Sequence, residues 1–211
     1  MPETENKRSL ALRVIVLVAS IVINAFSVSV YVKSDLGTST NSAVPLVMSA
    51  MIPGLSLGIA SIVFQALLLI VLLFICGKKR DYAVSFALGC LFGFVVDGWN
   101  ELWRVVPIGN LPPVALFFIA FFSLAFGIAM AIVTGLPTLP FDYFVKDLSV
   151  KFGKTVGFVK TSSDVSYVVV AFILSYAGLG RIYGIGIGTV FAMFCTGFVV
   201  HFFLKRIRWI C

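Results

Sequence analysis

Six long apolar runs constrain what this chain can fold into. They cover about residues 11–33, 57–76, 82–99, 111–134, 157–178 and 184–204. Each run is close to the roughly 20 residues that a helix needs to cross the hydrocarbon core of a bilayer. Because lipid offers no hydrogen-bond partners, a backbone that crosses it must form helices or a closed barrel. Runs of this length predict an all-α membrane protein with six transmembrane helices.

The composition agrees with this fold class. Of the 211 residues, 60% are apolar and 12% are charged, whereas soluble domains are roughly 45–50% apolar and about 25% charged. Six spans leave only short connections between them, so no room remains for a soluble catalytic domain. We therefore expect a single transmembrane domain over residues 1–211, in contact with the lipid bilayer.

The positions of the basic residues favour one orientation. If the N-terminus is cytoplasmic and the spans alternate, 13 of the 16 Lys and Arg residues lie at cytoplasmic ends. The other three are Lys33, Arg104 and Arg181. Cytoplasmic loops are rich in Lys and Arg, so this distribution predicts a multi-pass protein of the cell (plasma or inner) membrane with cytoplasmic N- and C-termini. The basic loops lack the interleaved aromatic residues typical of nucleic-acid binding, and we expect no nucleic-acid partner.

Two segments between the spans are too polar or too broken to cross the membrane. Residues 135–153 have helical periodicity and predict an amphipathic helix that begins at Pro140, with Asp142, Asp147 and other polar residues on one face. Residues 34–54 predict a short half-helix that begins after residues 38–41, although this segment contains Pro45.

The two halves of the chain show weak internal repetition at an offset of about 100 residues. The matched pairs are Leu36 with Leu136, Thr38 with Thr138, Gly54 and Gly58 with Gly153 and Gly157, and the identical Gly-Phe-Val-Val of residues 93–96 and 197–200. Their common order indicates a duplication, with one repeat over about 11–104 and the other over about 111–208. Three spans per repeat is an odd number, so the second copy is expected to have inverted topology, as in many secondary transporters.

Several short motifs resemble those of a known family. They are Lys33-Ser34-Asp35-Leu36-Gly37-Thr38-Ser39, Gly54-Leu55-Ser56-Leu57-Gly58, Gly93-Phe94-Val95-Val96-Asp97, Gly186-Ile187-Gly188-Thr189 and Pro140-Phe141-Asp142. Together they resemble the YitT/YczE-like integral membrane proteins of bacteria, a largely uncharacterised family, over nearly the whole chain. The resemblance implies a bacterial membrane protein and adds little about mechanism.

Ionisable and polar residues inside the spans are the best candidates for a binding site, because charge in hydrocarbon is costly unless it is paired or hydrated. Asp164 lies in the fifth span, one helical turn after Lys160, and its repeat counterpart is Gln65. Asp164 could line an aqueous cavity and bind a solute or ion. Alternatively, Lys160 could neutralise Asp164 while extending to the membrane surface.

Three further carboxylates are candidates with a structural alternative. Asp97 ends the third run and is followed by residues typical of the water interface, including Trp99 and Trp103. Asp35 and Asp142 lie beside the starts of the two short helices, where a carboxylate could bind a ligand or simply cap exposed N–H groups.

Few residues could support catalysis. The chain has one histidine, His201, and four cysteines without metal-ligand spacing, and it has no zinc, nucleophile-elbow or Walker motif. We therefore expect no enzymatic activity, no catalytic residue, no metal site and no cofactor.

The function that these features favour is a small inverted-repeat transporter or permease for a small polar solute. Two alternatives remain: a substrate-capture subunit of a multi-component uptake system, and a non-transport accessory or regulatory membrane protein. The sequence leaves open the solute, a coupling ion, and whether the chain forms a homodimer or binds a membrane partner protein.

Overall fold

The computed structural model describes residues 9–77, 80–106, 108 and 111–207, and within these residues the chain is entirely helical. The helices are α1 (Leu10–Ser34), α2 (Thr40–Met51), α3 (Leu57–Cys76), α4 (Asp81–Val105), α5 (Pro113–Thr134), α6 (Pro140–Phe152), α7 (Val156–Leu179) and α8 (Ile187–Ile207). All except α2 and α6 are long and apolar enough to cross a membrane. The prediction of an all-α membrane protein with six spans is confirmed.

The bounds of several spans differ from the sequence-based ranges, most clearly at the end of α4 and at both ends of α8. Helix α4 continues to Val105, past the tryptophans that were expected to mark its end at the interface. Residues 184–186 precede α8 as a loop, so the sixth span begins at Ile187 instead of residue 184. In the second case Gly184 adopts a positive φ of 71°, a conformation that continues no right-handed helix.

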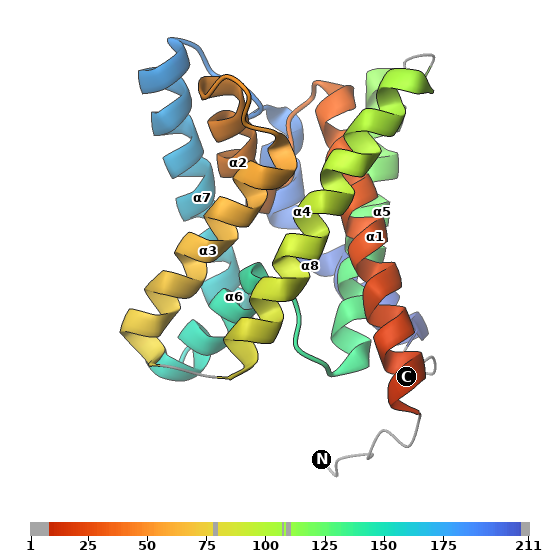
Figure 1. Cartoon of the computed structure of the whole chain (residues 1–211), viewed down its shortest axis with the longest axis vertical. Helices are drawn as coiled ribbons and strands as arrows, with labels where there is room; N and C mark the ends of the chain where they lie inside the picture. The colour runs from red at the N-terminus through yellow and green to blue at the C-terminus, as the bar shows by residue number, and fades with distance from the viewer. Residues whose placement is uncertain (1–8, 78–79, 107, 109–110, 208–211) are drawn as a thin grey trace.

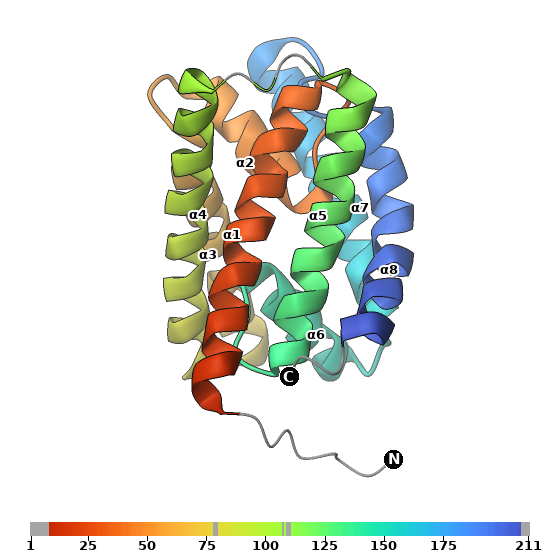
Figure 2. The same cartoon turned by 90° about the vertical axis from the view of Figure 1, so that its right-hand side faces the viewer.

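Helices α1 and α5 pack against each other along one side of the bundle, on the right in Figure 1 and in front in Figure 2. Helix α4 packs on α1 and helix α8 packs on α5. Helix α2 lies against α7 and α3, and helix α6 lies against α3 and α7. The start of α1 and the end of α8 lie at the same end of the bundle; we call the opposite end, which carries the loops 35–39 and 180–186, the distal end.

The two short helices lie in opposite halves of the bundle, α2 towards the distal end and α6 towards the other (Figure 1). They have 12 and 13 residues, which at 1.5 Å per residue gives about 18–20 Å, too short for a core of about 30 Å. Both predicted short helices are confirmed, and α6 begins at Pro140 as expected. Pro45 lies within α2, which continues past it.

Close approach of α3 and α4 depends on two glycines. A Cβ atom added to Gly58 would lie 2.0 Å from the carbonyl oxygen of Gly93, and one added to Gly93 would lie 2.6 Å from the carbonyl oxygen of Gly58. Small residues that let backbones approach are typical of helix pairs in membranes. Gly157 and Gly197, which the sequence analysis predicts as their repeat counterparts in α7 and α8, have no such neighbour within 4 Å, and these two helices contact each other only lightly.

Candidate functional site

An ion pair lies inside the bundle on α7. The Lys160 Nζ lies 2.5 Å from Oδ1 of Asp164, and the Asp164 side chain is only 6% exposed, whereas that of Lys160 is 33% exposed. The Thr40 hydroxyl donates a second hydrogen bond to the same carboxylate oxygen, at 2.9 Å. The i,i+4 pair considered from the sequence is therefore formed, and the hydrogen bond from Thr40 connects it to the first half of the chain.

Thr40 is the first residue of α2, so the carboxylate of Asp164 lies at the N-terminal end of this short helix. Helix N-termini carry a partial positive charge from unpaired N–H groups. The lysine and the helix terminus both stabilise a negative charge here, which explains how Asp164 can be buried. The sequence did not single out Thr40, although a Thr beside a helix start is a common signal for such a contact.

Asp142 lies in the first turn of α6 and lines a small interior cavity. The cavity has a volume of about 30 Å³ and is lined on its polar side by Asn24, Ser39, Asn41, Ser42 and Asp142. Because residues 39–42 begin α2, the first turns of both short helices meet at this cavity. Its volume is close to that of one water molecule in the liquid.

Burial raises the pKa of the Asp142 carboxyl from 3.8 to about 6; the charge on Lys160 opposes this shift and the charge on Asp164 adds to it. These influences place Asp142 electrostatically close to the ion pair on α7. The three predicted candidates Asp142, Lys160 and Asp164 therefore form one interior polar cluster, together with Thr40.

Gln65 is fully buried and lies near the start of the other short helix. Its Nε2 donates to the Ser61 carbonyl at 3.2 Å, while its Oε1 has no hydrogen-bond partner. A Cβ on Gly89 would meet both Oε1 of Gln65 and the ring of Pro140, the first residue of α6. Gln65 thus lies at the N-terminus of α6 as Asp164 lies at the N-terminus of α2.

Asp97 lies apart from the interior cluster, beside the start of α3. Its Oδ2 accepts a hydrogen bond from the Ser56 hydroxyl at 2.5 Å, and its Oδ1 accepts one from the Gly58 N–H at 2.8 Å. Ser56 is the residue that caps the start of α3. The carboxylate therefore joins the end of α4 to the N-terminus of α3, a contact that favours negative charge.

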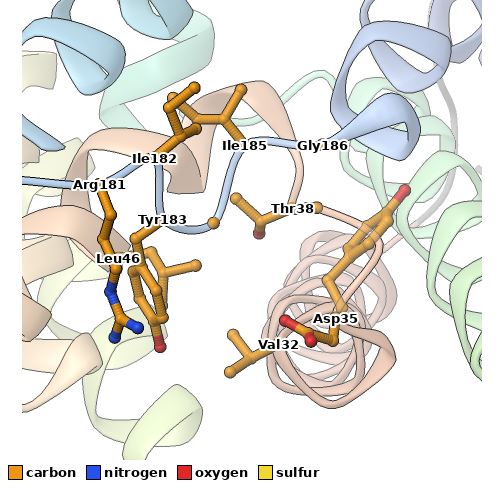
Figure 3. Close-up of a pocket in the computed structure, with 12 residues that line it drawn as sticks. Val32, Asp35, Thr38, Leu46, Arg181, Ile182, Tyr183, Ile185 and Gly186 are labelled. Carbon is orange, nitrogen blue, oxygen red and sulfur yellow. The ribbon is translucent and has the colours of Figure 1, made fainter. Parts of the chain in front are cut away.

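Asp35 follows the last residue of α1 and adopts a left-handed conformation with φ of 52°. It lines an open cavity of about 400 Å³ at the distal end, and Arg181 from the loop between α7 and α8 lines the same cavity (Figure 3). The structure therefore separates Asp35 from the interior cluster and groups it with an arginine that the sequence analysis used only for orientation.

The prediction for the polar face of α6 is wrong at Asp147. Instead of facing a polar surface, this carboxylate is buried and accepts a hydrogen bond from the Tyr82 hydroxyl of α4. Ser149 is buried as well, whereas Phe152 is 59% exposed. Helical periodicity separates the two faces of α6, but it does not show that α4 supplies a hydroxyl that satisfies a buried carboxylate.

Two further polar atoms inside the bundle are buried and lack a hydrogen-bond partner among the described residues. They are the hydroxyl of Tyr167 and the Oδ1 of Asn24. Native proteins rarely leave buried polar groups without a hydrogen-bond partner, so each such group requires an explanation. In the described part of the chain, no group of three or more His, Cys, Asp or Glu residues could hold a metal ion.

Six apolar spans around buried polar groups define this chain as a polytopic integral membrane protein. Residues 11–205 match the model of DUF6198, described as a family of unknown function, and the chain belongs to this family. No curated protein matches the chain, and no solved structure matches it.

Proposed function

We propose that the chain is a small transporter or permease for a small polar solute, without enzymatic activity. The observation that carries this proposal is the interior polar cluster of Thr40, Asp142, Lys160 and Asp164, which lies where the first turns of two non-spanning helices meet. Transporters typically bind solutes and coupling ions near the middle of the membrane, at the ends of interrupted helices. Charged groups buried there are costly unless they have a role.

The proposed fold is a pair of inverted repeats, and the packing of helices supports it. Each half contains a span, a short helix and two spans in the same order. Contacts also correspond: α2 packs on α7 as α6 packs on α3, and α1 packs on α4 as α5 packs on α8. The location of α2 and α6 in opposite halves of the bundle is what inversion requires.

Local structure at matched positions gives further support. The hydroxyl of Ser34 donates to the carbonyl three residues before it and accepts from the N–H two residues after it, and Thr134 does the same. Asp35 and Gly135 then adopt the same left-handed conformation. The ends of α1 and α5 are therefore alike, as a duplication predicts.

The start of each short helix is also tied to the last span of the opposite half. Ser85 of α4 donates a hydrogen bond to the carbonyl of Thr138, and Thr189 of α8 accepts one from the N–H of Thr38. Thr38 and Thr138 are repeat counterparts. Each short helix is thus held at the interior by a hydroxyl from the other half, which would couple its position to the movement of that half.

Kinship with the YitT/YczE-like proteins and a location in a bacterial cell membrane with cytoplasmic termini belong to the same proposal. The motif resemblance and the distribution of basic residues support them. The position of the start of α1 and the end of α8 at one end of the bundle agrees with an even number of spans.

The first test is to find the solute and its site. Purified protein is heated in detergent with a panel of amino acids, monocarboxylates, sugars and alkali cations, and each compound that raises the melting temperature is then used for uptake into proteoliposomes. A ligand at a hundredfold excess over Kd stabilises the folded state by about 2.7 kcal/mol.

We expect Asp164→Asn to remove uptake while leaving the helical content and melting temperature near those of the wild type, because Asn keeps the shape and can still accept from Thr40. Glu101→Gln is the matched control, since Glu101 is exposed and, among the described residues, pairs with the equally exposed Arg104. Unchanged uptake in Asp164→Asn would contradict the proposed site. Binding without uptake would favour a substrate-capture subunit instead.

A further inference from the structure

A cavity at the distal end has lining groups of opposite charge. It has a volume of about 400 Å³ and lies between the end of α1, the start of α2 and the loop before α8. Figure 3 shows Arg181 beside Tyr183 on one side of the cavity and Asp35 on the other. Neither charged group forms an ion pair with another described residue, so both remain available to a ligand.

The cavity wall between these two groups is formed by the loop after α1 and the loop before α8, which are joined by hydrogen bonds. The N–H of Thr38 donates to the carbonyl of Gly184 at 3.1 Å and to the hydroxyl of Thr189 at 3.0 Å, and the N–H of Gly188 donates to the carbonyl of Leu36 at 2.9 Å. A Cβ on Gly37 would lie 2.5 Å from the Thr189 hydroxyl. The loops from the two halves are therefore fastened together at the back of the cavity.

Both charged residues are held by their backbones. The Ser175 hydroxyl, fully buried in α7, donates to the Arg181 carbonyl at 2.7 Å and accepts from the Tyr183 N–H at 2.8 Å. The guanidinium of Arg181 lies over the Tyr183 ring, 5.8 Å from its centroid. Asp35 ends α1 in a left-handed conformation. These contacts fix the points from which the two side chains reach the cavity.

A third polar group lies between them. Thr38 lines the cavity between Arg181 and Asp35 (Figure 3), but its side chain is fully buried, and its hydroxyl has no hydrogen-bond partner among the described residues. Because this hydroxyl has no exposed surface, Thr38 forms part of the cavity wall, and the exposed Asp35 and Arg181 are the charged groups that a ligand can reach.

We propose that this cavity binds a small zwitterion, an α-amino acid, with its ammonium group at Asp35 and its carboxylate at Arg181. An arginine can hold a carboxylate through two parallel hydrogen bonds, and an ammonium group pairs with a carboxylate. A ligand with only one charge would meet an uncompensated like charge on the opposite wall. The volume lies within the roughly 300–1,000 Å³ typical of small-molecule sites. This site is separate from the interior cluster and goes beyond the proposed function.

The test measures binding to the full chain in detergent with glycine and L-alanine as probes, by equilibrium dialysis of the radiolabelled compounds and by melting temperature. Acetate and ethylammonium are included as the two halves of the ligand. We expect saturable binding of the amino acids, and for acetate and ethylammonium at least tenfold weaker binding. Absence of binding by both amino acids would overturn the inference, as would equal binding of the two half-ligands.

Two variants locate the site. Arg181→Gln and Asp35→Asn should each weaken amino-acid binding by about tenfold or more. Asn is a suitable replacement because it tolerates the left-handed conformation of residue 35. Arg104→Gln and Glu101→Gln are matched controls at the same end of the bundle, and both should bind as the wild type does. Unaltered binding in Arg181→Gln and Asp35→Asn would overturn the inference.

The outcome is distinguishable from that of the transport experiment. Asp164→Asn should retain amino-acid binding, because the interior cluster does not line this cavity. If Asp164→Asn removes binding while Arg181→Gln does not, the amino acid binds at the interior cluster; the further inference then fails and the proposed function stands. If binding depends on Arg181 but no uptake is found, the further inference stands and the proposed transport function fails.

Discussion

Unequal exposure of the two partners in the Lys160–Asp164 pair has a consequence for each residue. Lys160 is one-third exposed and has a long flexible chain, whereas Asp164 is almost completely buried. If Asp164 is removed, the ammonium group can extend towards water. If Lys160 is removed, the carboxylate keeps only Thr40 and the helix terminus as partners.

Lys160→Ala should therefore destabilise the protein more than Asp164→Ala. We expect a loss of about 3 kcal/mol for Lys160→Ala, at the lower end of the cost of breaking a buried pair, and about 1 kcal/mol for Asp164→Ala. Denaturant unfolding in mixed micelles measures both, and the double variant should be more stable than Lys160→Ala alone. A larger loss in Asp164→Ala would contradict the assignment of Asp164 as the buried partner.

Asp142 gives stability a pH dependence. Its pKa is about 6 in the folded protein, against an ordinary value of 3.8, so the folded state binds the proton more tightly. The contribution of this proton is complete below about pH 4 and is lost as the pH rises through 6. We expect the melting temperature of the wild type to fall between pH 4 and 7 relative to that of Asp142→Asn. A constant difference between the two proteins over this range would show that Asp142 does not titrate there.

At the scale of the helix, the sequence was sufficient wherever length and hydropathy alone decide the structure. The six spans and both short helices follow from them, because a bilayer sets a minimum length and Pro140 marks a helix start. Contacts between helices were not accessible in the same way. Asp147 was misplaced because Tyr82, its partner, lies 65 residues away in the chain.

Only part of the candidate site could be predicted from the sequence. Asp164, Lys160 and Asp142 stand out as charged residues in or near apolar segments, and the structure brings them together. Thr40 and Thr38 do not stand out, because a threonine in a polar loop is common; their roles depend on Asp164 and Gly184, which approach them only in the folded chain. Arg181 was not proposed as a site residue because its neighbour across the cavity, Asp35, lies in the other half.

The crossing of α3 and α4 can be tested by a matched pair of glycines. Gly58→Ala places a Cβ against the backbone of Gly93, which cannot move aside as a side chain can. We expect a loss of about 3 kcal/mol, the upper end for overpacking. Gly157→Ala, at the repeat counterpart, has open space around it and should be neutral or slightly stabilising, since Ala favours helix over Gly. Thermal unfolding of both variants makes the comparison; equal losses would contradict the difference between the two crossings.

For the whole molecule, the difference between the close α3–α4 crossing and the open α7–α8 pair predicts a conformational change. If the halves are inverted repeats that exchange conformations, α7 should close on α8 in the second state as α3 closes on α4 in the first. Spin labels at Phe158 and Phe198, which are 60% and 80% exposed, report the separation of α7 and α8 by pulsed electron resonance in a chain with its cysteines replaced. We expect a second, shorter distance when a transported solute is added. A single unchanged distance during active transport would contradict the exchange.

The α3–α4 and α7–α8 crossings also bear on the free-energy difference between the two conformations of a transport cycle. Gly58 and Gly93 make a close crossing, whereas Gly157 and Gly197 have nothing within 4 Å of an added Cβ. If the halves are inverted repeats, the structure therefore holds a closed and an open form of the same joint. Exchange would close the second joint as it opens the first, and the number of close backbone contacts would be conserved. The two end states would then differ little in free energy, and the modest differential affinity of a small solute would be enough to shift the population from one to the other.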